Sequence, residues 1–180
     1  MATQPLEQQE GTVKAPLLDS DIVIWVLRSD EPMVQFFEQL VEQAKQSPAV
    51  SVITVYEVLA GMRPQEEQET RKFLDRLIRL PVTEEIAEKA AEYYREFRAK
   101  GQTLHITDLL IAATSFCHNL PLATLNRDDF PMTDITFWQE VPSPPPDGKT
   151  QTHNDLLSQR FPPSTMATPA THTACFVSLG

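Results

Sequence analysis

Short apolar runs alternate with longer amphipathic stretches from Leu17 to Trp138, and this alternation limits the fold more than any other feature. Ala49–Val55 is an apolar, β-branched run preceded by Ser47-Pro48, which is typical of a strand buried on both faces. Further strands are expected at Leu17–Leu18, Leu80–Val82, Leu122–Leu125 and Ile135–Trp138. Strands that alternate with helices in this way predict an α/β sandwich with a mainly parallel sheet.

The amphipathic stretches between these runs predict helices. Thr83–Lys100 carries acids in its first turn and bases in its last, with Gly101 just beyond, which is the charge pattern of a complete helix. Pro32 opens another helix, whose apolar face is Val34, Phe37, Leu40 and Val41. Other helices are expected over 22–27, from Val55 to Met62, within 65–79, and from a cap at Thr107 to His118.

Composition shifts near both ends of the chain and predicts three regions. Residues 1–16 are polar, have no apolar period and are interpreted as a flexible arm. Residues 142–180 hold 7 of the 15 prolines and are rich in Ser and Thr, which predicts a disordered tail. The folded domain is therefore expected over 17–141.

The folded domain is strongly acidic. The net charge of the chain is −10; the arm contributes −1 and the charges of the tail cancel, which leaves −9 on residues 17–141. Proteins that hold nucleic acid by bulk electrostatics usually have a basic face, so this balance argues against that class. It does not argue against an enzyme that handles nucleic acid through bound metal, because metal sites need acids.

Two cysteines, Cys117 and Cys175, cannot form a disulfide framework or a cysteine zinc site. No apolar run approaches the ~20 residues needed to span a bilayer. The first ten residues lack the basic and apolar regions of a secretory signal. A cytoplasmic protein without membrane contact is therefore expected.

Four acids follow strands or open helices of the expected sheet. Asp19 comes after Leu17–Leu18, Glu57 after the run that ends at Val55, and Asp129 after Leu122–Leu125, while Asp108 opens a helix. Ligands of parallel sheets bind at the carboxyl ends of the strands. Carboxylates gathered there would repel one another, and a divalent cation such as Mg²⁺ relieves that repulsion. The pattern predicts metal-assisted hydrolysis of a phosphodiester.

Each acid also has a purely structural interpretation. Thr54 and Glu57 fit a capping box, and Asp19, Ser20 and Asp21 fit helix caps. Asp108 would favour the dipole of its helix, and Asp128 and Asp129 fit a turn. Other chemical candidates have structural alternatives too. His105 fits a solvated loop, His118 fits the end of a helix, and Cys117 fits the core or a helix surface. A solvated helix face accounts for the basic residues Arg71, Lys72, Arg76 and Arg79.

Four segments in order resemble the motifs of PIN-domain ribonucleases of the VapC toxin type. Residues 17–25 resemble the opening motif around Asp19, and residues 51–61 the second, with Glu57 before a Leu-x-Gly helix. Residues 107–114 resemble the third motif, in which Asp108 heads a Leu-Ile-Ala-Ala helix. Residues 122–130 resemble the fourth, Asn-x-x-Asp-Phe, which ends on Asp129 and Phe130. The resemblance covers about residues 16–140 and does not extend to the arm or the tail.

This resemblance implies a PIN-like three-layer α/β/α sandwich and a Mg²⁺- or Mn²⁺-dependent endoribonuclease acting on structured RNA such as tRNA or rRNA. It implies that Asp19 and Asp108 are metal ligands, that Glu57 and Asp129 complete the acidic pocket, and that Asn126 assists. It also implies a cognate small antitoxin protein as partner and a homodimer.

Two rival interpretations remain open at this stage. Asp19-Ser20-Asp21 fits the start of haloacid-dehalogenase phosphatases, but the late Gly-Asp motif of that family is missing, since no glycine lies between Gly101 and Gly148. A PIN-like protein that only binds or regulates a partner would be favoured by a missing acid, and none of the four is missing.

Overall fold

The computed structural model describes residues 14–139 and 141–142, all within the first of the chain's two units, Met1–Thr150. The helices and strands follow in the order β1 (Leu17–Leu18), α1 (Ser20–Leu27), α2 (Glu31–Ala44), β2 (Ala49–Ser51), α3 (Val52–Gly61), η1 (Pro64–Glu66), α4 (Glu67–Leu74), β3 (Ile78–Leu80), α5 (Glu84–Ala99), α6 (Ile106–His118), β4 (Leu122–Ala123) and η2 (Arg127–Asp129).

The four strands form one sheet in the order β3-β2-β1-β4, and every neighbouring pair is parallel. Leu17 is in register with Ala49 and Leu122, and Leu18 with Val50 and Ala123. β1 therefore lies between two strands that come 32 and 105 residues later in the chain. The predicted α/β class with a parallel sheet is confirmed.

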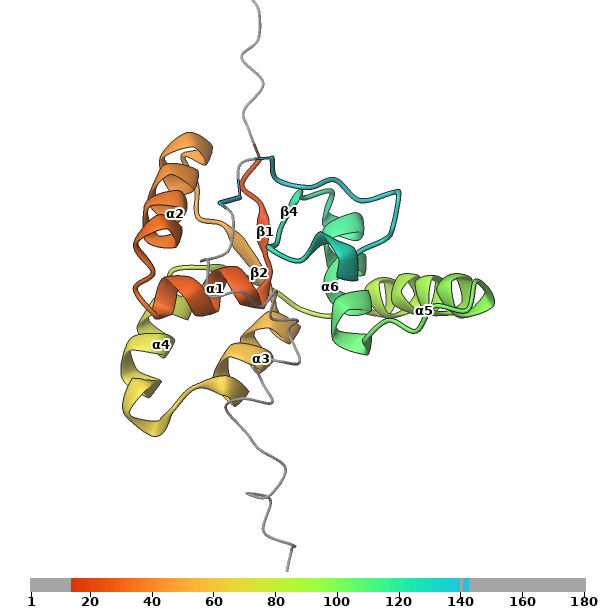
Figure 1. Ribbon diagram of the computed structural model, residues 1–180, viewed down its shortest axis with the longest axis horizontal. Helices are drawn as coiled ribbons and strands as arrows, with labels where there is room; N and C mark the ends of the chain where they lie inside the picture. Colours follow the sequence, from red (N-terminus) through yellow and green to blue (C-terminus); the bar gives the residue numbers. More distant parts are fainter. Residues whose placement is uncertain (1–13, 140, 143–180) are drawn as a thin grey trace, which may run out of the picture. The chain divides into compact units, whose positions relative to one another are not determined.

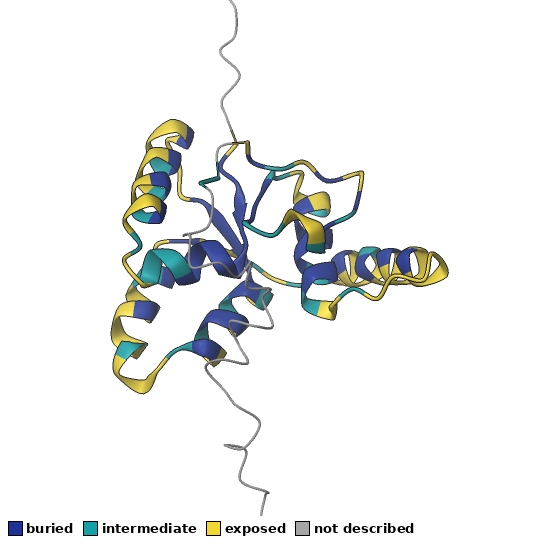
Figure 2. Ribbon diagram, viewed as in Figure 1, coloured by how far each residue is buried: buried dark blue, intermediate teal, exposed yellow. Residues whose placement is uncertain are grey.

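Helices cover both faces of the sheet and complete three layers. Successive strand residues point to opposite faces, so Leu17 and Leu18 belong to two different cores. The core around Leu17 is filled by α5 and α6, and the core around Leu18 by α1, α2 and α4 together with Val58 of α3. Figure 1 shows these two groups of helices on either side of the strands, and Figure 2 shows the strands buried between them.

The strand predicted at Ala49–Val55 is wrong in length. β2 ends at Ser51 and α3 starts at Val52, because the Ser51 hydroxyl accepts a hydrogen bond from the Ile53 N–H at 3.2 Å and caps the helix. Residues such as Val52, Ile53 and Val55 favour strands only weakly, and tertiary packing overrides that preference.

Other boundaries also move. The expected strand Leu80–Val82 is β3, Ile78–Leu80, and Leu122–Leu125 shortens to β4. Ile135–Trp138 forms a single parallel bridge, between Phe137 and Leu122, instead of a strand. The N-cap of α6 is His105 rather than Thr107, so the helix begins two residues earlier than expected.

The helix predicted over Thr83–Lys100 is confirmed as α5, with Thr83 as N-cap and Lys100 as C-cap. α2 begins at Glu31 with Pro32 in its first turn, capped by Asp30. Its most buried residues are Met33, Phe36, Leu40 and Ala44, so the buried face is rotated relative to the predicted one, and Val34, Phe37 and Val41 are only partly buried.

The predicted arm (1–16) and tail (142–180) fall almost entirely outside the described residues, and these two boundaries stay predictions. Among the helices that the structure describes, none has both the length and the apolar character needed to cross a bilayer.

Candidate active site

The carboxyl ends of β1, β2 and β4 meet at one edge of the sheet. Because Leu18 is in register with both Val50 and Ala123, the next residues of the three strands, Asp19, Ser51 and Thr124, lie side by side. The Asp19 N–H donates to the Ala123 carbonyl at 2.9 Å and continues the β1–β4 pairing to this edge. This is the edge at which parallel sheets bind ligands.

Asp19 is buried, with 6% of its surface exposed, and contacts both α1 and β4. Its Oδ1 accepts from the Ser20 N–H at 2.7 Å, as the capping interpretation predicted. Its Oδ2 accepts from the hydroxyl of Thr124 at 2.9 Å. Asp19 therefore caps α1 and also bonds to Thr124 at the end of the neighbouring strand β4. A role as helix cap does not prevent this carboxylate from taking part in a site at the edge of the sheet.

Asp21 lies beside Asp19 and is equally buried, with 6% exposed. Its Oδ1 accepts from the Ile22 N–H at 2.6 Å, and its Oδ2 accepts from the Leu125 N–H at 2.9 Å. Burial, followed by the charge of Asp19, raises the pKa of Asp21 well above its ordinary value. From the sequence, Asp21 fitted a helix cap or, in the rival interpretation, the phosphatase motif.

Glu57 is 1% exposed and lies in the second turn of α3. The capping-box alternative is wrong for this residue, because the N-cap of α3 is Ser51, and the Thr54 hydroxyl instead donates to the Leu18 carbonyl at 3.4 Å. Residues three apart share a helix face, so Glu57 lies on the face of α3 that meets the end of β1. A buried carboxylate there is not explained by capping.

Asp108 is the third residue of α6 and is 4% exposed. α6 leads into β4 through only three residues, so its C-terminus lies at the amino edge of the sheet and its N-terminus at the carboxyl edge. The Thr114 hydroxyl, two turns on, lies 3.5 Å from the Ser51 hydroxyl and fixes α6 beside the start of α3. The predicted position of Asp108 at the carboxyl edge follows from this path.

Asp129 is partly buried in η2 and is linked to Asp19 by hydrogen bonds. The Asn126 side-chain amide donates to Asp129 Oδ2, and the Asn126 N–H donates to the Thr124 hydroxyl oxygen at 3.1 Å. Thr124 in turn donates to Asp19. The sequence identified Asn126 but missed Thr124, whose only signal was a hydroxyl directly after a strand.

The carboxylates suit a hydrated magnesium ion better than a cage of side chains. Within residues 14–139 and 141–142, no three His, Cys, Asp or Glu side chains group closely enough to hold a metal ion among them. Mg²⁺ prefers oxygen ligands and keeps several waters, so one or two direct carboxylates suffice. The donors at this edge are all oxygens and fit that mode, and the assignment of Asp19 and Asp108 as ligands stays a prediction.

The remaining candidates lie away from this edge or on exposed surfaces. On α4, Arg71 pairs with Glu67 and Lys72 with Glu69, both at 2.8 Å, which favours the solvated-face interpretation. His118 is exposed in the last turn of α6, and His105 is exposed at its N-cap. Cys117 is a half-buried free cysteine on α6.

Comparison with known proteins gives a consistent result. The sequence model of the PIN domain matches residues 17–135. "Ribonuclease VapC10" of Mycobacterium tuberculosis is 38% identical over 117 residues, which is 64% of this chain and 86% of that protein. "Ribonuclease VapC19" of the same species is 29% identical over 116 residues, covering 64% of this chain and 92% of that protein.

Solved structures show the same fold. A toxin-antitoxin complex from Klebsiella pneumoniae is 28% identical with a TM-score of 0.55, covering 66% of this chain and 92% of that one. VapBC2 from Rickettsia felis, bound to a DNA fragment from its promoter, has a TM-score of 0.60 at 20% identity, covering 68% of this chain and 96% of that one.

Proposed function

The chain belongs to the PIN-domain family, and from this we propose that it is a metal-dependent endoribonuclease that cleaves structured RNA of the tRNA or rRNA class. The observation that carries the proposal is the buried carboxylate Asp19, hydrogen-bonded through Thr124 and Asn126 toward Asp129 at the carboxyl edge of the sheet. Its relatives named ribonucleases support the reaction class.

The proposed chemistry assigns a role to each acid. Asp19 and Asp108 would hold Mg²⁺ or Mn²⁺, which supplies an activated water and neutralises charge on the phosphate. Glu57 and Asp129 would orient the attacking water. Thr124 fixes the carboxylate of Asp19, and Asn126 fixes that of Asp129. Burial of these groups keeps bulk water away and strengthens their electrostatic effect.

We further propose that the chain is the toxin of a toxin–antitoxin pair, acts in the cytoplasm, and pairs with a second copy of itself. The toxin-antitoxin complex from Klebsiella pneumoniae, 28% identical to this chain, supports an antitoxin as the partner. The cytoplasm is where tRNA and rRNA meet such an enzyme. The phosphatase alternative is not retained, because the family match covers residues 17–135.

The experiment that tests the proposal is cleavage of total tRNA and rRNA by the purified full chain in Mg²⁺ or Mn²⁺. We expect cleavage that stops when EDTA is added, and that stops when the small protein encoded beside this chain is added. Asp19→Asn and Glu57→Gln keep side-chain shape and remove charge, and each should lower the rate by roughly 10²-fold or more. Glu38→Gln, on the exposed face of α2, should leave the rate unchanged.

Melting of each variant separates lost activity from lost fold. A wild-type protein that cuts no RNA in this pool with either metal would contradict the nuclease proposal. If Asp19→Asn cleaves RNA at the wild-type rate, the active site does not lie at the carboxyl edge of the sheet as proposed. Failure to cut, together with tight binding of the neighbouring small protein, would favour the regulatory alternative.

A further inference from the structure

Asp21 makes contacts that helix capping does not require. Its Oδ1 accepts from the Ile22 N–H at 2.6 Å, within α1. Its Oδ2 accepts from the Leu125 N–H at 2.9 Å and lies 3.3 Å from the Thr124 hydroxyl. One carboxylate thus joins the first turn of α1 to the segment after β4, more than 100 residues later in the chain.

The segment that Asp21 holds leads directly to the fourth acid. Leu125 is followed by Asn126, whose side chain donates to Asp129, and Asn126 also donates its N–H to Thr124. Thr124 and Leu125 are therefore the fixed end of the turn that carries Asp129. A shift of either residue would move Asp129 relative to Asp19.

A comparison with Asp30 shows what a simple cap looks like in this chain. Asp30 caps α2 by accepting from the Met33 N–H at 3.2 Å and is only partly buried. Asp21 is buried beside a second carboxylate, Asp19, and burying two like charges together is costly. A Ser or Asn would cap a helix at lower cost, so the cross-chain bond to Leu125 is what distinguishes this position.

We propose that Asp21 is a positioning residue of the active site: it holds Thr124 and Leu125, and through them sets where Asp129 lies relative to Asp19. The kinetic consequence rests on the proposed nuclease function, whereas the structural consequence does not. The two are therefore tested separately.

The structural test is hydrogen exchange of single backbone amides in the full chain. Asp21→Ala removes the acceptor of the Leu125 N–H, so exchange at Leu125 and Asn126 should become at least ~10-fold faster relative to amides of α5. Asp30→Ala, the matched cap variant, should leave that ratio unchanged. Asp21→Asn keeps one acceptor oxygen and should fall between wild type and Asp21→Ala. An unchanged Leu125 ratio in Asp21→Ala would overturn the proposal.

The kinetic test is a double-mutant cycle with Asp129→Asn. Asp21→Ala should lower kcat on the order of 10- to 100-fold in the wild-type background, the scale of a misplaced catalytic group, with little change in KM. In the Asp129→Asn background the same change should lower kcat much less, because its effect acts through Asp129. Full additivity of the two losses would overturn the positioning role.

The two tests separate failure of this inference from failure of the proposed function. If wild-type protein cleaves no RNA, the proposed function fails, and the exchange ratio at Leu125 still decides whether Asp21 holds the segment. If wild-type cleavage is normal and Asp21→Asn retains it while Asp21→Ala loses it, an acceptor oxygen at this position accounts for the rescue. The exchange ratio at Leu125 in Asp21→Asn then decides whether that oxygen holds the Leu125 N–H or only caps α1.

Discussion

Asp134, which contacts Tyr93 and Lys89 of α5, shows how neighbouring groups change the pKa of a single carboxyl. The Tyr93 hydroxyl donates to its Oδ1 at 2.7 Å, and Lys89 Nζ lies 2.9 Å from its Oδ2. The same ammonium lies over the rings of Tyr93 and Phe116, at 4.5 and 4.2 Å. Burial alone would raise the pKa of Asp134, but Tyr93 and Lys89 outweigh it and hold that pKa below its ordinary value.

A lowered pKa in the folded state makes stability depend on pH in a known direction. The native chain binds fewer protons at Asp134 than the unfolded chain does. The ionised Asp134 therefore stabilises the fold at pH values above its unfolded pKa, and this stabilisation is lost as the pH falls through its folded pKa. Asp134→Asn should therefore lower Tm at pH 7 and have almost no effect near pH 2. Thermal melts at both pH values check this, with the exposed Asp128→Asn as control.

An equal loss of Tm for Asp134→Asn at both pH values would show that packing, rather than charge, gives the residue its effect. Asparagine still accepts from the Tyr93 hydroxyl, so the substitution isolates the charge that faces Lys89.

At the scale of elements, α5 and α6 end at residues that tolerate positive φ. Gly101, just past the C-cap of α5, has φ +76°, and Asn119 at the C-cap of α6 has φ 50°. Both residue types enter this region more readily than others, which is why the sequence located these two helix ends correctly.

Gly101 allows the conformational effect to be measured without a steric one. A Cβ at this position would meet no atom within 4 Å, so only the backbone conformation opposes a side chain. We expect Gly101→Ala to lower the free energy of unfolding by about 1 kcal/mol, and Gly101→Asn to lower it less. Denaturant titration of the three proteins checks the order. Equal losses for Ala and Asn would point to a cause other than the positive φ.

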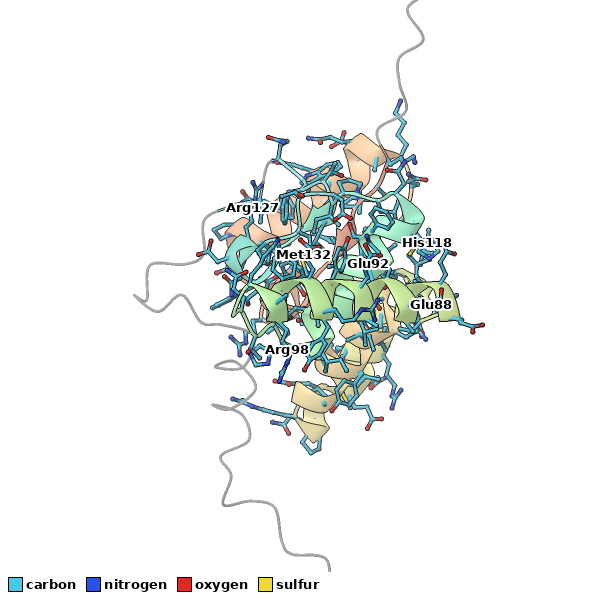
Figure 3. All side chains as sticks on the ribbon, turned by 90° about the vertical axis from the view of Figure 1, so that its right-hand side faces the viewer. Glu88, Glu92, Arg98, His118, Arg127 and Met132 are labelled. Atoms are coloured by element: carbon cyan, nitrogen blue, oxygen red, sulfur yellow. The ribbon has the colours of Figure 1, made fainter. Side chains whose placement is uncertain are left out.

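At the scale of the whole molecule, we expect the proposed second copy to pack on an apolar groove between α5 and α6. The groove holds about 510 Å³ and includes Tyr94 and Ile106, which are 43% and 73% exposed. Along α5, acids such as Glu88 lie toward the N-terminus and Arg98 toward the C-terminus, as Figure 3 shows. Two such helices packed antiparallel would place opposite charges together.

Sedimentation measurements on the full chain test this surface. We expect wild-type protein to sediment as two chains, and Ile106→Glu to sediment as one, because a buried glutamate in the groove would lack a partner. Ile78→Glu, on the exposed side of β3, is the matched control and should leave the pair intact. A wild-type protein that is monomeric at ~100 μM would overturn the pairing. If Ile78→Glu dissociates the pair and Ile106→Glu does not, the interface between the two copies lies near β3 instead of in the α5–α6 groove.

The sequence by itself predicted a parallel sheet and the candidate acids at its carboxyl edge. Alternating apolar runs predicted the sheet, strand ends and helix starts made Asp19, Glu57, Asp108 and Asp129 the candidates, and residues that tolerate positive φ located two helix ends. These signals are local, because side-chain period, capping and backbone freedom act over a few residues. Such signals also carry errors of a few residues, as the premature end of β2 shows.

Only the tertiary structure decided what surrounds each acid. Whether Glu57 caps a helix depended on Ser51 ending β2 early, and the contacts of Asp21 with Leu125 join residues more than 100 positions apart. Thr124 reaches Asp19 only because β1 and β4 pair in one particular register. Register in a parallel sheet is set by the burial of both faces together, and no local pattern in the sequence records that balance.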